Sequence, residues 1–127
     1  HGVSLSTQRG DFALAVLEGV AFQIRIMLEA MQAYENVHTL VLFGGGAKST
    51  LWAQIIADIT GICIEVPETS EAAGAGAAIL AGIAAGTFDR NNTPVLRHNR
   101  SYQPSGRQAA YEAKFQTYRQ LEKKLWH

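Results

Sequence analysis

The segment LVLFGGGAKSTL, residues 40–51, restricts the fold of this chain more than any other part of it. A short run of strand-forming apolar residues leads into three consecutive glycines, and a helical pattern follows. Glycine lets the backbone turn sharply and approach a ligand, while the start of a helix offers unpaired N–H groups and a positive dipole end. The segment therefore predicts an anion site, most often a phosphate site. A tight turn without a ligand is the alternative, although one glycine would be enough for it.

Elsewhere in the chain, strands alternate with helices. The spacing of apolar residues predicts helices at 11–34, 50–60, 71–86 and about 107–125, strands at 38–43 and 62–66, and irregular structure at 87–106. Ser49 or Thr50 is placed to cap the second helix, and Ser70 the third. The order α-β-α-β-α, followed by a loop and a C-terminal helix, predicts an α/β fold with two parallel strands joined by a crossover helix.

The third predicted helix, residues 71–86, has an unusual composition. Alanine and glycine make up 12 of its 16 residues, and each interior glycine costs about 1 kcal/mol relative to alanine. Ile79, Leu80 and Ile83 make the segment too apolar for a flexible linker. We therefore expect another backbone, helix or ligand to approach closely at its glycines.

Charge and composition exclude several classes of function. The chain has 11 Lys and Arg against 11 Asp and Glu, a balance that argues against nucleic acid or an anionic membrane as a partner. The longest stretch without a polar side chain, residues 72–86, is 15 residues long, and a spanning helix needs about 20. Cys63 is the single cysteine, so an intramolecular disulfide and a Cys-based zinc site are excluded. We expect a cytoplasmic protein.

The histidines show neither the spacing of metal ligands nor a pairing with a nucleophile. They are His1, His38, His98 and His127. We therefore expect no metal ligands in this chain and reject a hydrolase.

The glycine loop departs from two common phosphate-binding motifs. Both glycines that a Walker A loop requires are replaced, by Leu42 and Ala47. In the Rossmann fingerprint Gly44 and Gly46 fit, but Ser49 occupies the third position.

A Rossmann-type dinucleotide-binding module nevertheless stays open as an alternative. Glu65 ends the predicted second strand, 19 residues after Gly46, where an acid that binds ribose would lie. A non-enzymatic interaction domain is a further alternative, in which the glycine-rich and C-terminal helices would bind a partner.

Several motifs recur along the chain in a fixed order. The glycine loop is followed by a helix that ends in Ala57-Asp58-Ile59, and then by a short strand. Residues 71–86 carry the pattern E-x-x-x-x-G-A-A-x-L-A-G-x-x-x-G, and residues 2–18 carry G-V, seven residues, D-F, two residues and A-V-L-E. In these motifs residues 2–88 closely resemble the C-terminal domain of the FGGY family of carbohydrate kinases.

This resemblance implies a partial actin-like, ribonuclease H-like ATPase fold. Residues 1–127 would be the C-terminal nucleotide-binding part of a sugar kinase, and the N-terminal sugar-binding lobe would lie outside this chain. Members of the family transfer the γ-phosphoryl group of ATP, which is bound with Mg²⁺, to a sugar or polyol hydroxyl. Their catalytic base is an Asp of the N-terminal lobe, and Asp11, Asp58 and Asp89 match no such motif. We therefore expect no catalytic residue in this chain.

On the matching positions, the resemblance also implies the nucleotide site. Gly44, Gly45 and Gly46 would bring backbone N–H groups to the phosphates of ATP or ADP. Ala47 would line the nucleotide path, and Ser49 would lie toward the adenosine. Lys48 is expected to be a solvated charge.

The substrate and the assembly state follow less directly. Trp52 and Gln54 match xylulokinase-like members of the family, so a ketopentose such as xylulose is the first expectation, with other sugars and polyols open. If the first strands of the lobe lie outside the chain, the strand at 40–43 has an exposed edge that could pair with a second copy. A homodimer is therefore a candidate assembly.

Overall fold

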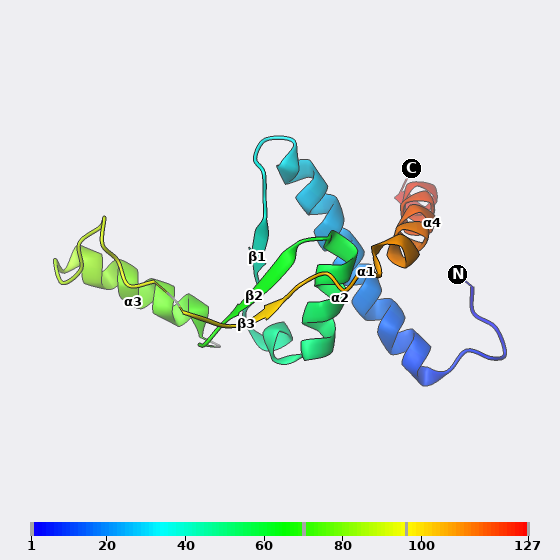
Figure 1. Cartoon of the computed structure of the whole chain (residues 1–127), viewed down its shortest axis with the longest axis horizontal. Coiled ribbons are helices and arrows are strands. Elements are labelled where there is room, and N and C mark those ends of the chain that lie inside the picture. Colours follow the sequence, from blue (N-terminus) through cyan, green and yellow to red (C-terminus); the bar gives the residue numbers. More distant parts are fainter. Residues whose placement is uncertain (1, 70, 96, 127) are drawn as a thin grey trace.

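The computed structural model describes residues 2–69, 71–95 and 97–126, which form a three-stranded sheet, four α-helices and one 3₁₀ helix (Figure 1). In chain order the elements are α1 (Arg9–Gln32), β1 (Thr39–Val41), η1 (Gly45–Lys48), α2 (Thr50–Thr60), β2 (Cys63–Pro67), α3 (Ala72–Ala84), β3 (His98–Tyr102) and α4 (Gln108–Trp126). The predicted helices and the first two strands are present; α2 has the predicted bounds, and the ends of the others are shifted. Ser70, the expected cap of α3, lies outside the described residues.

The sheet has the strand order β1-β2-β3. β1 and β2 are parallel, with Thr39 opposite Cys63, and α2 connects them as the predicted crossover helix. β3 runs antiparallel to β2, so the prediction of irregular structure throughout residues 87–106 was wrong. The sequence of β3, HNRSY, has no apolar alternation. It forms a strand because its backbone completes the hydrogen bonds along the second edge of β2.

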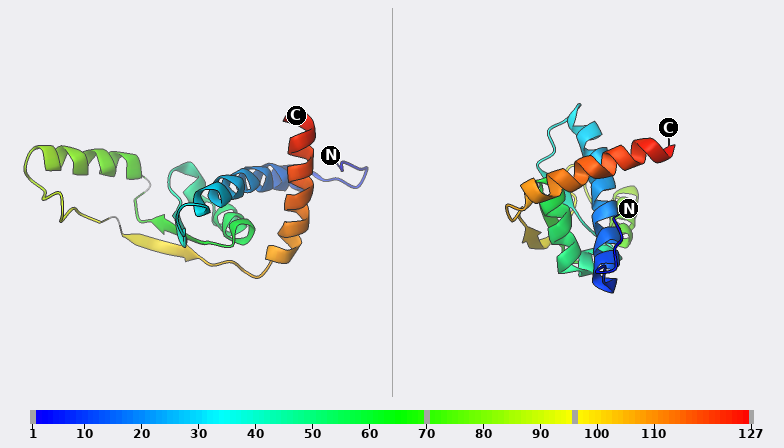
Figure 2. Two further views of the ribbon diagram at one scale, coloured as in Figure 1. Left: turned by 90° about the horizontal axis from the view of Figure 1, so that it is seen from above. Right: turned by 90° about the vertical axis from the view of Figure 1, so that its right-hand side faces the viewer.

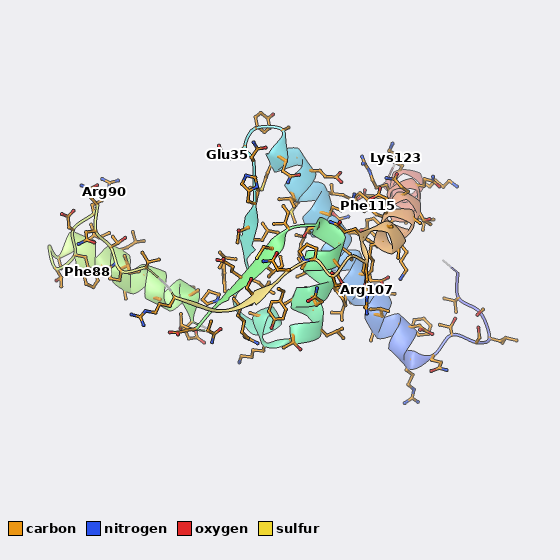
Figure 3. The ribbon with its side chains drawn as sticks, in the orientation of Figure 1. Glu35, Phe88, Arg90, Arg107, Phe115 and Lys123 are labelled. Atoms are coloured by element: carbon orange, nitrogen blue, oxygen red, sulfur yellow. The ribbon has the colours of Figure 1, made fainter. Side chains whose placement is uncertain are left out.

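The hydrophobic core lies where α1, α2 and α4 meet the sheet. α4 crosses α1, and the Phe115 ring, which is fully buried, lies between these helices (Figures 2 and 3). Phe22 of α1 packs against Phe115 with 5.6 Å between ring centroids. The Arg25 guanidinium lies 4.0 Å from the Phe115 ring centroid and pairs with Glu112 at 2.6 Å. Aromatic packing and ion pairs thus hold α4 to α1.

A buried carboxylate fixes the turn that leads into α4. Asp58, near the end of α2, is only 1% exposed. It accepts hydrogen bonds from the backbone N–H of Ser105 at 2.6 Å, from the Ser105 hydroxyl at 2.9 Å and from the Gln54 amide at 3.0 Å. These donors offset the desolvation of the Asp58 carboxyl group, which therefore has a structural role in holding the turn before α4.

α3 projects away from the sheet and the other helices (Figures 1 and 2). None of its residues is buried. A Cβ on Gly74 or Gly76 would meet no atom within 4 Å, whereas one on Gly82 would overlap the Phe88 ring, at the far end of α3 (Figure 3). Within the described residues, the neighbour that approaches these helix glycines is a side-chain ring at Gly82 alone, and not the backbone or helix that was expected.

Candidate anion-binding site

The loop between β1 and α2 forms the candidate site. The backbone N–H of Leu42 donates to the carbonyl of Glu65 at 2.8 Å, which extends the pairing of β1 with β2 to the edge of the loop. The chain then turns at Gly44, whose φ of +79° lies in the region that favours glycine. η1 follows directly, and α2 begins at Thr50. The two rigid strands thus fix the point at which the glycines enter the loop.

Three consecutive backbone N–H groups in this loop are available to a ligand. Among the described residues, the N–H groups of Gly44, Gly45 and Gly46 have no hydrogen-bond acceptor. The N–H of Ala47 donates to the Gly44 carbonyl at 3.2 Å, and that of Ser49 to the Gly46 carbonyl at 3.1 Å. These two bonds shape the turn and leave the three glycine donors free. Successive free N–H groups at a helical start are a general anion-binding arrangement.

Two of the three glycines are required by the fold, each for a different reason. Gly44 needs its positive φ, and a Cβ on Gly46 would overlap the ring of Trp52. Gly45 has neither constraint, because a Cβ there would meet no atom within 4 Å. The fold therefore leaves open space beside Gly45, in which a bound group could approach the backbone.

Two hollows lie beside the loop. One, of about 310 Å³, lies between the loop and the beginning of α3. The other, of about 70 Å³, lies between the loop, the end of β2 and β3. Gly44 and Lys48 line both hollows. Arg100 and Glu68 also line the smaller one, and Glu71 the larger one. Lys48 is exposed, as expected for a solvated charge, but it lies at the mouth of the candidate site, where its ammonium favours an anionic ligand.

The remaining predicted site residues have structural contacts of their own. Ala47 is 5% exposed, so its side chain belongs to the interior and only its backbone is near the loop surface. Ser49 is the N-cap of α2, as predicted, and its hydroxyl oxygen accepts from the Trp52 N–H at 3.2 Å. All five predicted residues thus lie in one continuous turn, with the three glycines presenting the free donors.

Arg100 is the basic residue at this site that the sequence interpretation missed. It belongs to β3, which lies in the stretch predicted to be irregular, and no spacing relates it to the glycine loop. Glu65, the acid of the Rossmann alternative, lies in the middle of β2 rather than at its end.

Neither a metal centre nor a membrane span is found in the part of the chain that the structure describes. No group of three or more His, Cys, Asp or Glu residues there is arranged to hold a metal ion. No described helix combines the length and the hydrophobicity that a bilayer crossing requires.

The fold and the loop define an α/β lobe with a candidate anion-binding turn between a strand and a helix. Residues 1–85 match the model of the C-terminal domain of the FGGY family of carbohydrate kinases. The chain belongs to this family, as its motifs predicted.

Individual relatives agree with this assignment. An autoinducer-2 kinase from Yersinia enterocolitica is 43% identical over 79 residues, which cover 59% of this chain and 15% of that protein. A probable L-xylulose kinase from Pasteurella multocida is 32% identical over 126 residues, 95% of this chain and 25% of that protein.

A crystal structure described as a xyloylose kinase from Brucella ovis superimposes with a TM-score of 0.87 at 34% identity. The match covers 98% of this chain and 26% of that one. The chain thus spans between 15% and 25% of the length of the curated relatives it matches. The fold class predicted from the sequence is confirmed, because the structural neighbours are sugar kinases of this family.

Proposed function

We propose that this chain is the C-terminal, ATP-binding portion of a carbohydrate kinase, which transfers the γ-phosphoryl group of ATP to a sugar hydroxyl. The observation that carries the proposal is the run of three free N–H groups at Gly44, Gly45 and Gly46. Phosphoryl transfer depends on holding the phosphates in place and on stabilising their charge. Oriented N–H donors at a helical start, beside Lys48, are suited to both tasks.

In this mechanism each part of the loop has a separate role. The N–H groups of Gly44, Gly45 and Gly46 bind the phosphate oxygens of ATP and later those of ADP. Ala47 contributes its backbone to the same turn, and Ser49 faces the nucleoside end of the nucleotide. Mg²⁺ accompanies the nucleotide, and we assign it no ligand, since the described residues form no metal-binding cluster. The base that deprotonates the sugar hydroxyl and the sugar pocket lie on another part of the polypeptide.

We propose a ketopentose such as xylulose as the acceptor. The probable L-xylulose kinase aligns over 95% of this chain, and the xyloylose kinase structure over 98%. Relatives named as an autoinducer-2 kinase and a glycerol kinase make other sugars and polyols the alternatives to be tested.

The test uses the whole polypeptide that contains residues 1–127. ADP release is measured with ATP, Mg²⁺ and a panel of acceptors: D- and L-xylulose, other pentuloses, glycerol and gluconate. We expect release that depends on one acceptor, with a ketopentose giving the highest kcat/KM. A higher value for another acceptor would overturn the substrate proposal alone. Binding of NAD without binding of ATP or ADP would overturn the kinase proposal and favour the dinucleotide alternative.

Self-association and a cytoplasmic location are also part of the proposal. Among the described strands, β1 pairs with β2 alone, and Val41 and Phe43 at or beside it are about half exposed. A free edge with apolar neighbours favours pairing with a second copy. Sedimentation of the 127-residue chain at increasing concentration tests this, and a monomer at every concentration would contradict it.

A further inference from the structure

The carbonyl side of the glycine loop is held by a residue that lies far from it in the sequence. The Nη2 atom of Arg100, on β3, donates a hydrogen bond to the carbonyl oxygen of Ala47 at 3.0 Å, across 53 residues of chain. The same guanidinium donates from Nη1 to the Tyr102 hydroxyl at 3.5 Å. Tyr102 in turn packs against the hydrophobic core. Arg100 therefore connects the loop to the rigid sheet.

This contact matters because the loop contains little else that fixes its orientation. Gly44, Gly45 and Gly46 have no side chains, and the backbone of glycine is the least restricted of all residues. The buried side chain of Ala47 and the ring of Trp52 hold the loop from the α2 side. Arg100 holds it from the side of β3, through the carbonyl of Ala47, the residue that follows the three glycines.

The chemistry of the contact also suits an anion site. A hydrogen bond from a guanidinium is charge-assisted, and it is stronger than one between neutral groups. Arg100 lines the smaller hollow together with Gly44, Lys48 and Glu68, so its charge lies near the first of the three free donors. No ion pair to a carboxylate of the described residues neutralises Arg100.

We infer that Arg100 is a positioning residue for nucleotide binding, which acts by holding the Ala47 carbonyl so that the N–H groups of Gly44–Gly46 face the phosphates. This inference rests on the proposed function. It also adds a residue outside the segment that matches the family model, which ends at residue 85.

The test compares Arg100→Ala with wild type in the whole polypeptide that contains this segment. Loss of one charge-assisted hydrogen bond is expected to raise the KM for ATP and the Kd for ADP about 10-fold. The KM for the sugar is expected to stay unchanged, because the sugar pocket lies elsewhere. Arg100→Lys, which keeps a charged donor, is expected to recover most of the affinity. A merely structural role would lower the folded fraction and kcat and would leave the KM for ATP unchanged.

Arg97→Ala is the matched control for charge. Arg97 is exposed, lies just before β3, and its side chain makes no hydrogen bond or ion pair with another described residue. We expect its KM for ATP to stay within about twofold of wild type, because one more distant exposed charge is largely screened by salt. An equal rise in both variants would overturn the positioning role and leave only a general charge effect.

If Arg100→Ala fails to fold, Arg100→Gln decides the question. Its amide is neutral and shorter than the guanidinium, so the hydrogen bond to the Ala47 carbonyl is weakened. A Kd for ADP higher than that of Arg100→Lys supports the inference, and a Kd equal to that of wild type overturns it. The outcomes separate the two proposals. A wild-type protein that binds no nucleotide overturns the proposed function and this inference together, whereas an active wild type with an unaffected Arg100→Ala overturns the inference alone.

Discussion

The indole ring of Trp52 fills the space that a Cβ on Gly46 would need. Trp52 lies in the first turn of α2, and its backbone N–H is held by the Ser49 hydroxyl at 3.2 Å. The indole nitrogen is buried without a hydrogen-bond partner in the described structure. The ring therefore supports the loop by van der Waals contact alone. The loop backbone can lie against the ring only because residue 46 is glycine.

Gly46→Ala is expected to destabilise the protein. The added methyl group would overlap the Trp52 ring, and overpacking of this kind costs about 1–3 kcal/mol. Chemical denaturation monitored by circular dichroism measures the loss. Gly45→Ala is the matched control, because a Cβ there meets open space. We expect Gly45→Ala to change the free energy of unfolding by less than about 0.5 kcal/mol and to weaken ADP binding. Equal stability of the two variants would contradict the Trp52 contact.

Asp58→Ala is expected to cost about 3 kcal/mol of folding free energy. The substitution leaves the Ser105 N–H and hydroxyl without their acceptor beside α4, where each lost hydrogen bond to a charged group is costly. Ser105→Ala removes the hydroxyl donor alone and should cost about 1 kcal/mol. Urea titration measures the free energy of unfolding of both variants. A Ser105→Ala variant as unstable as Asp58→Ala would show that the carboxylate is not the centre of the contact.

Truncation of Phe115 should show that α4 belongs to the core. Phe115 is 0% exposed and Leu125, on the same helix, is 77% exposed. We expect Phe115→Ala to lower the free energy of unfolding by about 3–5 kcal/mol and Leu125→Ala to change it by less than about 0.5 kcal/mol. Thermal unfolding measures both. A small effect of Phe115→Ala would mean that α4 packs elsewhere.

Acid should weaken the contact between α1 and α4. Hydrogen bonds from Gln116 and Arg25 lower the pKa of the Glu112 carboxyl below its ordinary value of 4.5. A carboxylate with a lowered pKa in the folded state stabilises the protein fully above the ordinary value, and this contribution is lost as the pH falls through the lowered one. We expect wild type to be more stable than Glu112→Gln at pH 7 and the difference to vanish in acid. A difference that is independent of pH would refute the ionic origin of the contact.

Hydrogen exchange should distinguish α3 from α2. A helix of 13 residues with interior glycines and no buried residue has only its own helical propensity to hold it. In the 127-residue chain we expect the amides of α3 to exchange much faster than those of α2, most of whose residues are buried. Gly76→Ala, at a site with open space, should slow the exchange in α3, because alanine favours the helix by about 1 kcal/mol. Comparable protection of α2 and α3 in wild type would show that another surface covers α3.

The sequence predicted the elements whose side chains have a clear period or a clear end signal. The helix after the glycine loop begins after its Ser49 cap and ends before Gly61, whose φ of +73° suits the left-handed cap position. The parallel pairing of β1 and β2 followed from their order around α2. The glycine loop was predicted as the anion site on the same grounds, and the structure places its three glycine N–H groups free.

The parts that the sequence did not predict depend on pairing between distant segments. β3 has a polar sequence, and its strand conformation comes from the edge of β2. Arg100 could not be related to the loop without β3, so its bond to Ala47 was also missed. Packing of α3 was predicted from its glycines, but helix composition alone does not say whether a neighbour is present.

The buried position of Phe115 and the bond between Arg100 and Ala47 together have a consequence for how this domain is delimited. The family model ends at residue 85, yet the segments after that residue supply one strand of the sheet, part of the core and a support of the glycine loop. A recombinant protein cut at the end of the family match would expose the second edge of β2 and the core surface that Phe115 covers. Its aggregation would then reflect the choice of boundary and not the behaviour of the natural domain.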